Sequence, residues 1–319
     1  MCGIKAVAVL GAGTMGHSIA IALLQRMIPV SLVDVSGPAL DSARKTISNY
    51  LEKRFKDGKL TVQESTDIYQ CLDTFKEIDR GVEGVNLVIE AVPEIPNLKM
   101  QLFERLDRIC PPEVVLATNT SGIPITSIAE TTSHKERVIG THFYMPAHLI
   151  PLVEVIKSKY TGEEAAGITV EFLRAVGKKP VLVNKDIPGF IGNRLQHAIA
   201  REAISLVQNG IASVHDVDTV ARYTLGLRFP HTGPLEQRDL NGLDIHLAIT
   251  EYLYSALENS TEPLAILKEK VAQGMLGVKS GRGFYNWEDC NKEELMDRKY
   301  ELLVKVLELV DSFEGDSSK

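Results

Sequence analysis

A glycine-rich stretch lies near the start of the chain, directly after a short and largely apolar run. Residues 11–16 read Gly-Ala-Gly-Thr-Met-Gly, and the six residues before them read KAVAVL. A pattern with helical periodicity follows from His17 to Gln25. This order predicts a buried strand, a tight turn and the start of a helix, and it constrains the fold more than any other feature of the sequence.

Each glycine of this turn has a physical role in binding a dinucleotide. Gly11 permits the tight turn, Gly13 lets the backbone approach a pyrophosphate, and Gly16 allows the helix to pack close to the strand. Thr14 and Met15 lie where the free N–H groups of a helix N-terminus face phosphates. The sequence therefore predicts a dinucleotide site formed by Gly11, Gly13, Thr14, Met15 and Gly16.

A second apolar strand, residues 29–33, ends at Asp34. A carboxylate at this position accepts hydrogen bonds from both ribose hydroxyls and repels a 2′-phosphate, so it favours NAD over NADP. The alternative is that Asp34 only caps a helix beginning near Ser36. In the full strand-helix-strand context, we predict NAD as the cofactor.

Strand and helix patterns alternate up to about residue 183, and the pattern is almost entirely helical from Phe190 onward. The fold class is therefore α/β: a Rossmann-type doubly wound sheet at residues 1–185, followed by an all-α C-terminal domain at residues 186–319. The predicted strands are 85–92, 114–118, 138–142, 152–156 and 181–183, and the predicted helices are 38–55, 61–72, 97–109, 125–130 and 163–175.

Composition excludes several classes of function. The net charge of −7 over 319 residues argues against a nucleic-acid surface. No apolar run reaches the length of about 18 residues that a membrane span needs, and the first strand begins too close to Met1 for a cleaved signal. We expect a cytoplasmic protein without a metal site, since no metal-ligand spacing is formed by the cysteines Cys2, Cys71, Cys110 and Cys290.

Four polar residues follow predicted strands or begin the first helix of the second domain: Ser121, His142, Glu154 and Asn193. A histidine is a good general base near neutral pH, but it needs a partner on its other ring nitrogen. Glu154 lies in an otherwise apolar strand, where a carboxylate is costly unless it is paired. Pairing with His142 would remove that cost, although each residue alone also fits a structural role.

Several motifs, in matching order and spacing, make the chain similar to the 3-hydroxyacyl-CoA dehydrogenase family along almost its whole length. These motifs are VLGAGTMG (9–16), EAVPEIPNLKMQLFERLD (90–107), ATNTSGIPITSIA (117–129), GTHFYMPAHLIPLVEVI (140–156), KDIPGFIGNRL (185–195), GPLEQRDLNGLD (233–244) and KSGRGFYNW (279–287).

The resemblance implies the reversible oxidation of a 3-hydroxyl to a 3-ketone with NAD. His142 resembles the catalytic base, Glu154 its partner, and Ser121 and Asn193 the polar groups around the reacting oxygen. The resemblance also implies a helical domain that contributes to the substrate site and forms a homodimer. Residues that align with cofactor contacts of the family are Glu94, Lys99, Ser121 and Lys279.

Three departures from the family pattern concern the substrate. Met145 replaces the asparagine of the usual His-Phe-Phe-Asn-Pro motif, and Tyr50 stands where the family places a serine against CoA. Arg228 resembles the λ-crystallin and gulonate dehydrogenase branch, and an arginine there can form a bidentate pair with a substrate carboxylate. Alternatively, Arg228 forms a salt bridge with Glu236 or Asp239.

Three functions remain open from the sequence. The leading hypothesis is an NAD-dependent 3-hydroxyacyl-CoA dehydrogenase of fatty acid metabolism with a short-chain substrate such as 3-hydroxybutyryl-CoA. The alternative is a dehydrogenase of a free small 3-hydroxy acid, such as gulonate or carnitine. The third is a dinucleotide-binding protein without turnover, against which the joint presence of Ser121, His142, Glu154 and Asn193 argues.

Overall fold

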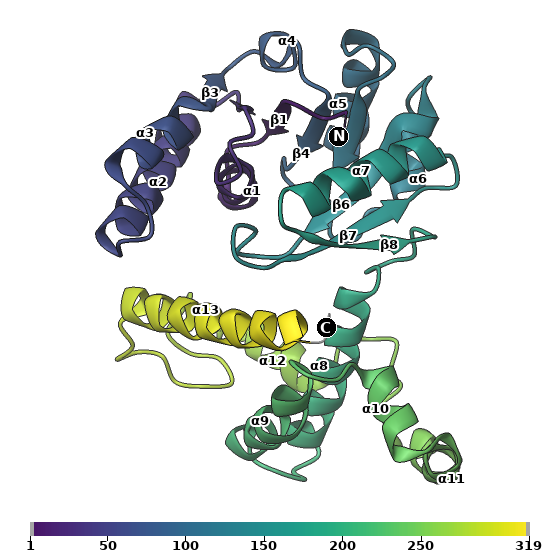
Figure 1. The fold of residues 1–319 in the computed structure, drawn as a ribbon. Helices are drawn as coiled ribbons and strands as arrows, with labels where there is room; N and C mark the ends of the chain where they lie inside the picture. The colour runs from purple at the N-terminus through teal and green to yellow at the C-terminus, as the bar shows by residue number, and fades with distance from the viewer. Residues whose placement is uncertain (1–2, 317–319) are drawn as a thin grey trace. The chain divides into compact units, whose positions relative to one another are not determined.

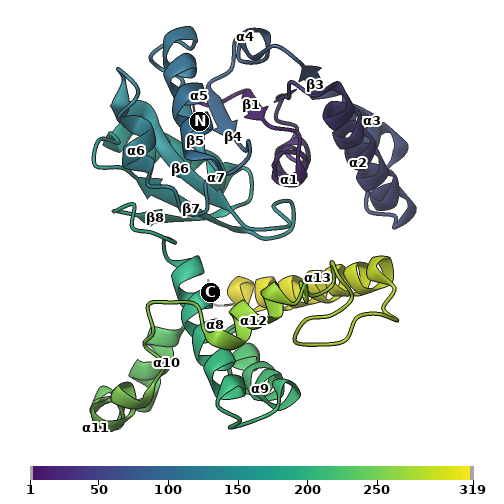
Figure 2. The ribbon, with the colours of Figure 1, turned by 180° about the vertical axis from the view of Figure 1, so that it is seen from behind.

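A computed structural model describes residues 3–316 of the chain, with Cys2 outside this range. The chain divides into two compact units between Arg194 and Leu195. We call the first the sheet unit and the second the helical unit, and each is described by itself (Figures 1 and 2).

The sheet unit is built on one eight-stranded sheet with the strand order β3-β2-β1-β4-β5-β6-β7-β8. Neighbouring strands from β3 to β6 are parallel, β7 runs antiparallel to β6, and β8 is parallel to β7. This topology confirms the predicted Rossmann-type sheet. The strands are β1 (Val7–Leu10), β2 (Val30–Val33), β3 (Leu72–Phe75), β4 (Leu87–Glu90), β5 (Val115–Thr118), β6 (Val138–Phe143), β7 (Leu152–Lys157) and β8 (Lys179–Val183).

Helices pack on both faces of this sheet (Figures 1 and 2). Alternate side chains of the strands enter two separate cores, because successive residues of a strand point to opposite faces. One core is completed by α1 (Thr14–Leu24), α2 (Gly37–Lys56), α3 (Val62–Gln70) and α7 (Glu163–Ala175), and the other by α4 (Ile78–Gly81), α5 (Pro96–Ile109) and α6 (Ile125–Ala129). A short 3₁₀ helix, η1 (Lys135–Arg137), precedes β6.

The sequence did not predict strand β3. The helix predicted at residues 61–72 ends earlier, at Gln70, and begins with a capping box between Thr61 and Glu64. Residues 72–75 then pair in parallel with β2 at the edge of the sheet. A four-residue edge strand has too few residues to show a clear periodicity, and its hydrogen bonds come from a strand some forty residues away.

The helical unit consists of helices joined by loops, which confirms the predicted helical C-terminal region. Helix α8 (Gly192–Gln208) crosses the division between the two units. In the described range, no helix is long and apolar enough to cross a membrane. The remaining helices are α9 (Val214–Ala221), η2 (Arg222–Gly226), α10 (Pro234–Asn241), α11 (Leu243–Leu253), η3 (Tyr254–Ala256), α12 (Ala265–Ala272) and α13 (Lys292–Asp316).

Candidate active site

The turn between β1 and α1 has the geometry that a dinucleotide requires. Gly11 has a φ of +102°, and a Cβ at Gly16 would lie 1.7 Å from the carbonyl oxygen of Gly11, so neither position tolerates a side chain. A Cβ at Gly13 meets nothing within 4 Å, and Gly13 caps α1 without a side-chain hydrogen bond. The N–H groups at the start of α1 are therefore accessible to phosphate, and Thr14 and Met15 lie in this first turn.

Asp34 lies directly after β2 and faces the same turn. Its Oδ2 accepts a hydrogen bond from the backbone N–H of Ala12 at 2.8 Å, and its Oδ1 accepts one from Ser36 at 2.8 Å. The N-cap of α2 is Ser36, whose hydroxyl accepts from Ala39. Asp34 is thus fixed beside the glycine turn rather than capping the helix, and the residues present fit the adenosine end of NAD.

His142 and Glu154 lie directly opposite each other in the antiparallel pair of β6 and β7. Residues in register on neighbouring strands point to the same face of a sheet. The Nδ1 atom of His142 lies 2.8 Å from Oε2 of Glu154, and both residues are buried. Because Nδ1 is bound to the carboxylate, Nε2 is the ring nitrogen available for exchanging a proton with a substrate.

The carboxylate of Glu154 also receives backbone hydrogen bonds from the turn before α8. Its Oε1 accepts from Ile191 at 2.8 Å and from Gly192 at 2.9 Å. The turn is bent by Gly189, with a φ of +75°, and Phe190, with a φ of +47°. Burial by itself raises the pKa of Glu154, but hydrogen bonds from His142, from this turn and from Tyr144 outweigh burial and hold the pKa below its usual range.

Ser121 and Asn193 are joined by a hydrogen bond, in which the Asn193 amide donates to the backbone carbonyl of Ser121 at 3.1 Å. Ser121 follows β5, and its backbone N–H donates to Oε1 of Glu94 at 2.9 Å. Burial raises the pKa of Glu94, but hydrogen bonds from Thr120 and the charge of Lys99 outweigh it, so the pKa is lowered. The structure therefore brings Glu94, Ser121 and Asn193 together at the carboxyl ends of the parallel strands β4 and β5.

Lys99 is almost completely buried in α5, and its ammonium group binds two carboxylates. Its Nζ lies 2.6 Å from Oε1 of Glu90 and 3.2 Å from Oε2 of Glu94. Glu90 also accepts hydrogen bonds from the hydroxyl of Thr118 at 2.6 Å and from the backbone N–H of Val92 at 2.8 Å. Lys99 thus stabilises the charged groups beneath the site, and its predicted contact with the cofactor stays a prediction.

Sequence reasoning missed two residues that hold the site together. Asn119, directly after β5, accepts a hydrogen bond from the backbone N–H of Phe143 at 2.8 Å and so links the ends of β5 and β6. Tyr144, directly after β6, donates its hydroxyl to Oε2 of Glu154 at 2.8 Å. The available signal was a polar residue directly after a strand, the same signal that predicted Asp34 and Ser121 as site residues.

The helical unit contains two further predicted site residues, Arg228 and Lys279, and both are exposed. The Nε of Arg228 donates to the carbonyl of Thr224 at 3.0 Å, one helical turn earlier. The contacts predicted for Arg228 with a substrate and for Lys279 with the cofactor stay predictions.

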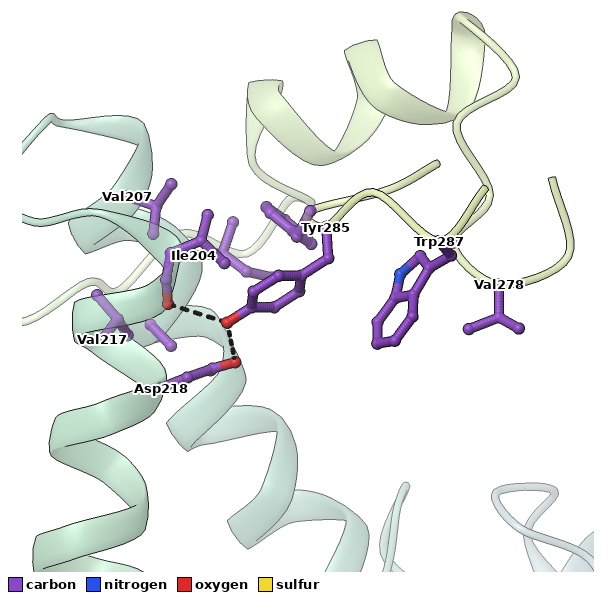
Figure 3. A pocket seen from close by; sticks show the side chains of 11 residues that line it. Ile204, Val207, Val217, Asp218, Val278, Tyr285 and Trp287 are labelled. Atoms are coloured by element: carbon purple, nitrogen blue, oxygen red, sulfur yellow. Dashed lines mark hydrogen bonds between the residues drawn. The ribbon is translucent and has the colours of Figure 1, made fainter. Parts of the chain in front are cut away.

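A cavity of about 380 Å³ lies in the helical unit between α8, α9 and the loop before α13 (Figure 3). Its walls are mostly apolar, and the carboxylate of Asp218 accepts a hydrogen bond from the hydroxyl of Tyr285 at 2.7 Å. Figure 3 shows the Trp287 ring beside Tyr285. The cavity is thus a mostly apolar hollow in which Tyr285 and Asp218 form a hydrogen-bonded polar pair.

The structure shows no cluster of metal-binding side chains within residues 3–316. Cys71, Cys110 and Cys290 are free thiols. Burial raises the pKa of the Cys110 thiol to about 11, so it is an inert core residue.

Comparison with known proteins identifies the family of the chain. Residues 6–187 match the family model "3-hydroxyacyl-CoA dehydrogenase, NAD binding domain", and residues 189–287 match "3-hydroxyacyl-CoA dehydrogenase, C-terminal domain". The Rossmann sheet with its glycine turn therefore defines an NAD-binding oxidoreductase. More specifically, the chain belongs to the 3-hydroxyacyl-CoA dehydrogenase family.

Individual relatives fall into two groups that differ in coverage. A "probable 3-hydroxybutyryl-CoA dehydrogenase" of Bacillus subtilis is 39% identical over 287 residues, which cover 90% of this chain and 98% of that protein. A 5-formyl-3-hydroxy-2-methylpyridine 4-carboxylate 5-dehydrogenase of Mesorhizobium japonicum is 31% identical and covers 98% of this chain and 100% of its own length.

A solved structure also matches almost the whole chain. The crystal structure of a 5-formyl-3-hydroxy-2-methylpyridine 4-carboxylic acid 5-dehydrogenase, described as an NAD+-dependent dismutase, has a TM-score of 0.88 at 30% identity. It covers 97% of this chain and 99% of its own. Helix α13 lies beyond both matched family models, the second of which ends at residue 287.

Proposed function

We propose that this protein oxidises the 3-hydroxyl of a short-chain 3-hydroxyacyl-CoA, such as 3-hydroxybutyryl-CoA, to the 3-ketone with NAD, and that it also catalyses the reverse reaction. The observation that carries the proposal is the 2.8 Å contact between His142 Nδ1 and Glu154 Oε2. Glu154 fixes the tautomer and the orientation of the imidazole, so that Nε2 accepts a proton. The identity to 3-hydroxybutyryl-CoA dehydrogenases supports the choice of substrate.

In this proposal, the residues of the chain handle the proton, and NAD, when bound, accepts the hydride from C3. His142 takes the hydroxyl proton on Nε2 as the carbonyl forms, and Glu154 stabilises the resulting imidazolium. Asn193 and Ser121 orient the reacting oxygen, and their mutual hydrogen bond supports this pairing. In the reverse direction, His142 returns the proton to the oxygen of the ketone.

Replacement of the proposed base tests this function. His142→Gln keeps a polar side chain of similar size but removes the titratable nitrogen, so NADH formation from 3-hydroxybutyryl-CoA should fall by roughly 10²- to 10⁴-fold. The matched control is His134→Gln, because His134 contacts Asp107 away from the site, at 3.2 Å. Unchanged NADH formation in His142→Gln would overturn the catalytic assignment and favour a dinucleotide-binding protein without turnover.

A second candidate substrate is a small 3-hydroxy acid with a free carboxylate in place of the CoA thioester. Full-length similarity to the pyridine carboxylate dehydrogenase, including the region of α13, favours this class. The departures from the family pattern at positions 50 and 145 also favour a free acid over a CoA thioester. Tyr50 donates to Gln25 at 3.0 Å and its ring contacts His148, while Met145 is exposed.

Steady-state kinetics with both substrate classes decide between these candidates. Turnover of a free hydroxy acid without turnover of any acyl-CoA would exclude the first candidate. Arg228→Met should then raise KM for the free acid by roughly 10-fold or more, because a charge-assisted pair with the carboxylate is lost. The matched control is Arg222→Met, which changes an exposed arginine of the same helical region.

A further inference from the structure

Tyr144 and His142 bind the same oxygen atom of Glu154. The Tyr144 hydroxyl donates to Oε2 at 2.8 Å, and His142 Nδ1 lies 2.8 Å from that oxygen. The two rings also pack against each other, with centroids 4.5 Å apart. Tyr144 therefore contacts both members of the proposed catalytic pair, although it takes no part in the mechanism described above.

The carboxylate of Glu154 has four hydrogen-bond donors, two on each oxygen. Ile191 and Gly192 bind Oε1, and His142 and Tyr144 bind Oε2. An ionised carboxylate has about four acceptor positions, so this one is saturated. Its negative charge is shared among four donors. Each further donor therefore reduces the negative charge that can stabilise a protonated imidazole.

The fold makes room for the Tyr144 hydroxyl at a specific place. A Cβ at Gly192 would lie 2.0 Å from the hydroxyl oxygen, so only glycine at this position leaves the space open. Burial and the bond to Glu154 raise the pKa of Tyr144 above its usual range, so the phenol stays protonated and donates.

A further ring packed against His142 is uncharged. The turn before α8 contributes the Phe190 ring, whose centroid lies 5.7 Å from that of His142, and Asn193 follows in the same segment. The loop after β5 contributes Asn119, which binds the backbone of Phe143. Among the residues that the structure describes, the titratable side chains Glu154 and Tyr144 contact the His142 ring.

From this geometry we infer that Tyr144 is a positioning residue that lowers the proton affinity of His142 by competing with it for Oε2 of Glu154. The inference rests on the proposed role of His142 as the base. Its effect is to keep more of the imidazole in the neutral form that accepts the substrate proton. Without the phenol, Oε2 would serve His142 alone and would hold the imidazolium more strongly.

The test is a titration of the His142 imidazole in the full chain, followed by NMR of labelled histidine with the signal assigned from His142→Gln. Tyr144→Phe removes only the hydroxyl and should move the titration midpoint upward by roughly half to one pH unit. Replacement of Tyr144 by 3-fluorotyrosine strengthens the donor and should move the midpoint downward. The control is Tyr160→Phe, which removes a hydroxyl that binds Glu130 at 3.2 Å outside the site.

Opposite shifts for the two Tyr144 replacements support the inference, because a purely structural role would not reverse with donor strength. No shift beyond that of Tyr160→Phe, or two shifts in the same direction, would overturn it. The fluorotyrosine arm keeps the test decisive if Tyr144→Phe is poorly folded. The acidic limb of kcat/KM for oxidation of 3-hydroxybutyryl-CoA should move with the NMR midpoint.

The titration needs no substrate, so its outcome is separable from the proposed function. If His142→Gln retains full turnover, the assignment of the base fails whatever the titration shows. If His142→Gln is inactive and the Tyr144 variants titrate like the parent, only the role of Tyr144 is wrong.

Discussion

Glu154 is the residue on which most polar groups of the candidate site converge. In the sequence it is an acid inside an apolar strand, a position that is unfavourable unless the charge is paired. In the structure, four donors from two segments of the chain, residues 142–144 and 191–192, bind it. Since its pKa is depressed in the folded protein, its ionised form contributes to stability as well as to the site.

This linkage predicts how the stability conferred by Glu154 depends on pH. A carboxyl group with a lowered folded-state pKa contributes fully above its ordinary value, 4.5 for glutamate, and this contribution is lost as the pH falls through the folded-state pKa. Glu154→Gln should destabilise the protein by about 1–3 kcal/mol at neutral pH, since an NH2 group replaces one of the two oxygens that accept from buried donors. The difference from the parent should shrink as the pH falls below 4.5.

Urea unfolding of parent and variant at several pH values measures this difference. The control is Glu171→Gln, which changes an exposed glutamate on α7. A difference that stays constant down to about pH 3.5 would contradict a depressed pKa for Glu154.

At the scale of elements, the β1-turn-α1 segment shows why glycines of the same motif have different roles. Gly16 is fixed by contact with the turn itself, since a Cβ there would overlap the carbonyl oxygen of Gly11. Gly13 faces open space and has an ordinary backbone conformation, with a φ of −68°. Gly16 is therefore required by the fold, whereas Gly13 is required only when a pyrophosphate approaches the backbone.

Alanine substitutions should therefore separate folding from cofactor binding. Gly13→Ala should leave the melting temperature close to that of the parent and weaken NAD binding by roughly 10-fold or more, because a methyl group occupies the space of the pyrophosphate. Gly16→Ala should lower stability by roughly 1–3 kcal/mol, as expected for an overpacked contact. Thermal unfolding and calorimetric titration with NAD provide both values, and equal affinity of Gly13→Ala and parent for NAD would contradict this assignment.

At the scale of the whole molecule, the helical unit leaves an unusual amount of apolar side chain exposed. Helix α11 has no buried residue, and Leu247 on it is 61% exposed. Other large apolar side chains of this helix are also exposed. In both ribbon views, α10 and α11 project away from α8 and α9 within this unit (Figures 1 and 2). A helix that is apolar on an uncovered surface indicates an interface with another chain.

We therefore expect the homodimer that the family resemblance implies, with α11 contributing to the contact. Leu247→Lys places a charge in this surface and should shift the protein toward a monomer in sedimentation equilibrium, with the dissociation constant raised by roughly 10-fold or more. The matched control is Val62→Lys, a comparably exposed apolar position of the sheet unit, at 64%. A parent chain that sediments as a monomer would exclude the predicted dimer.

The sequence by itself determined the Rossmann sheet, the glycine turn, NAD as the cofactor and the helical C-terminal region. These features depend on local patterns: apolar periodicity, glycines at fixed spacing and one carboxylate after the second strand. Tertiary structure decided the pairing of β3, the junction made by Asn119, and the four donors that meet at Glu154. Local patterns do not encode those contacts, and only the folded backbone brings Tyr144, Ile191 and Gly192 to the same carboxylate.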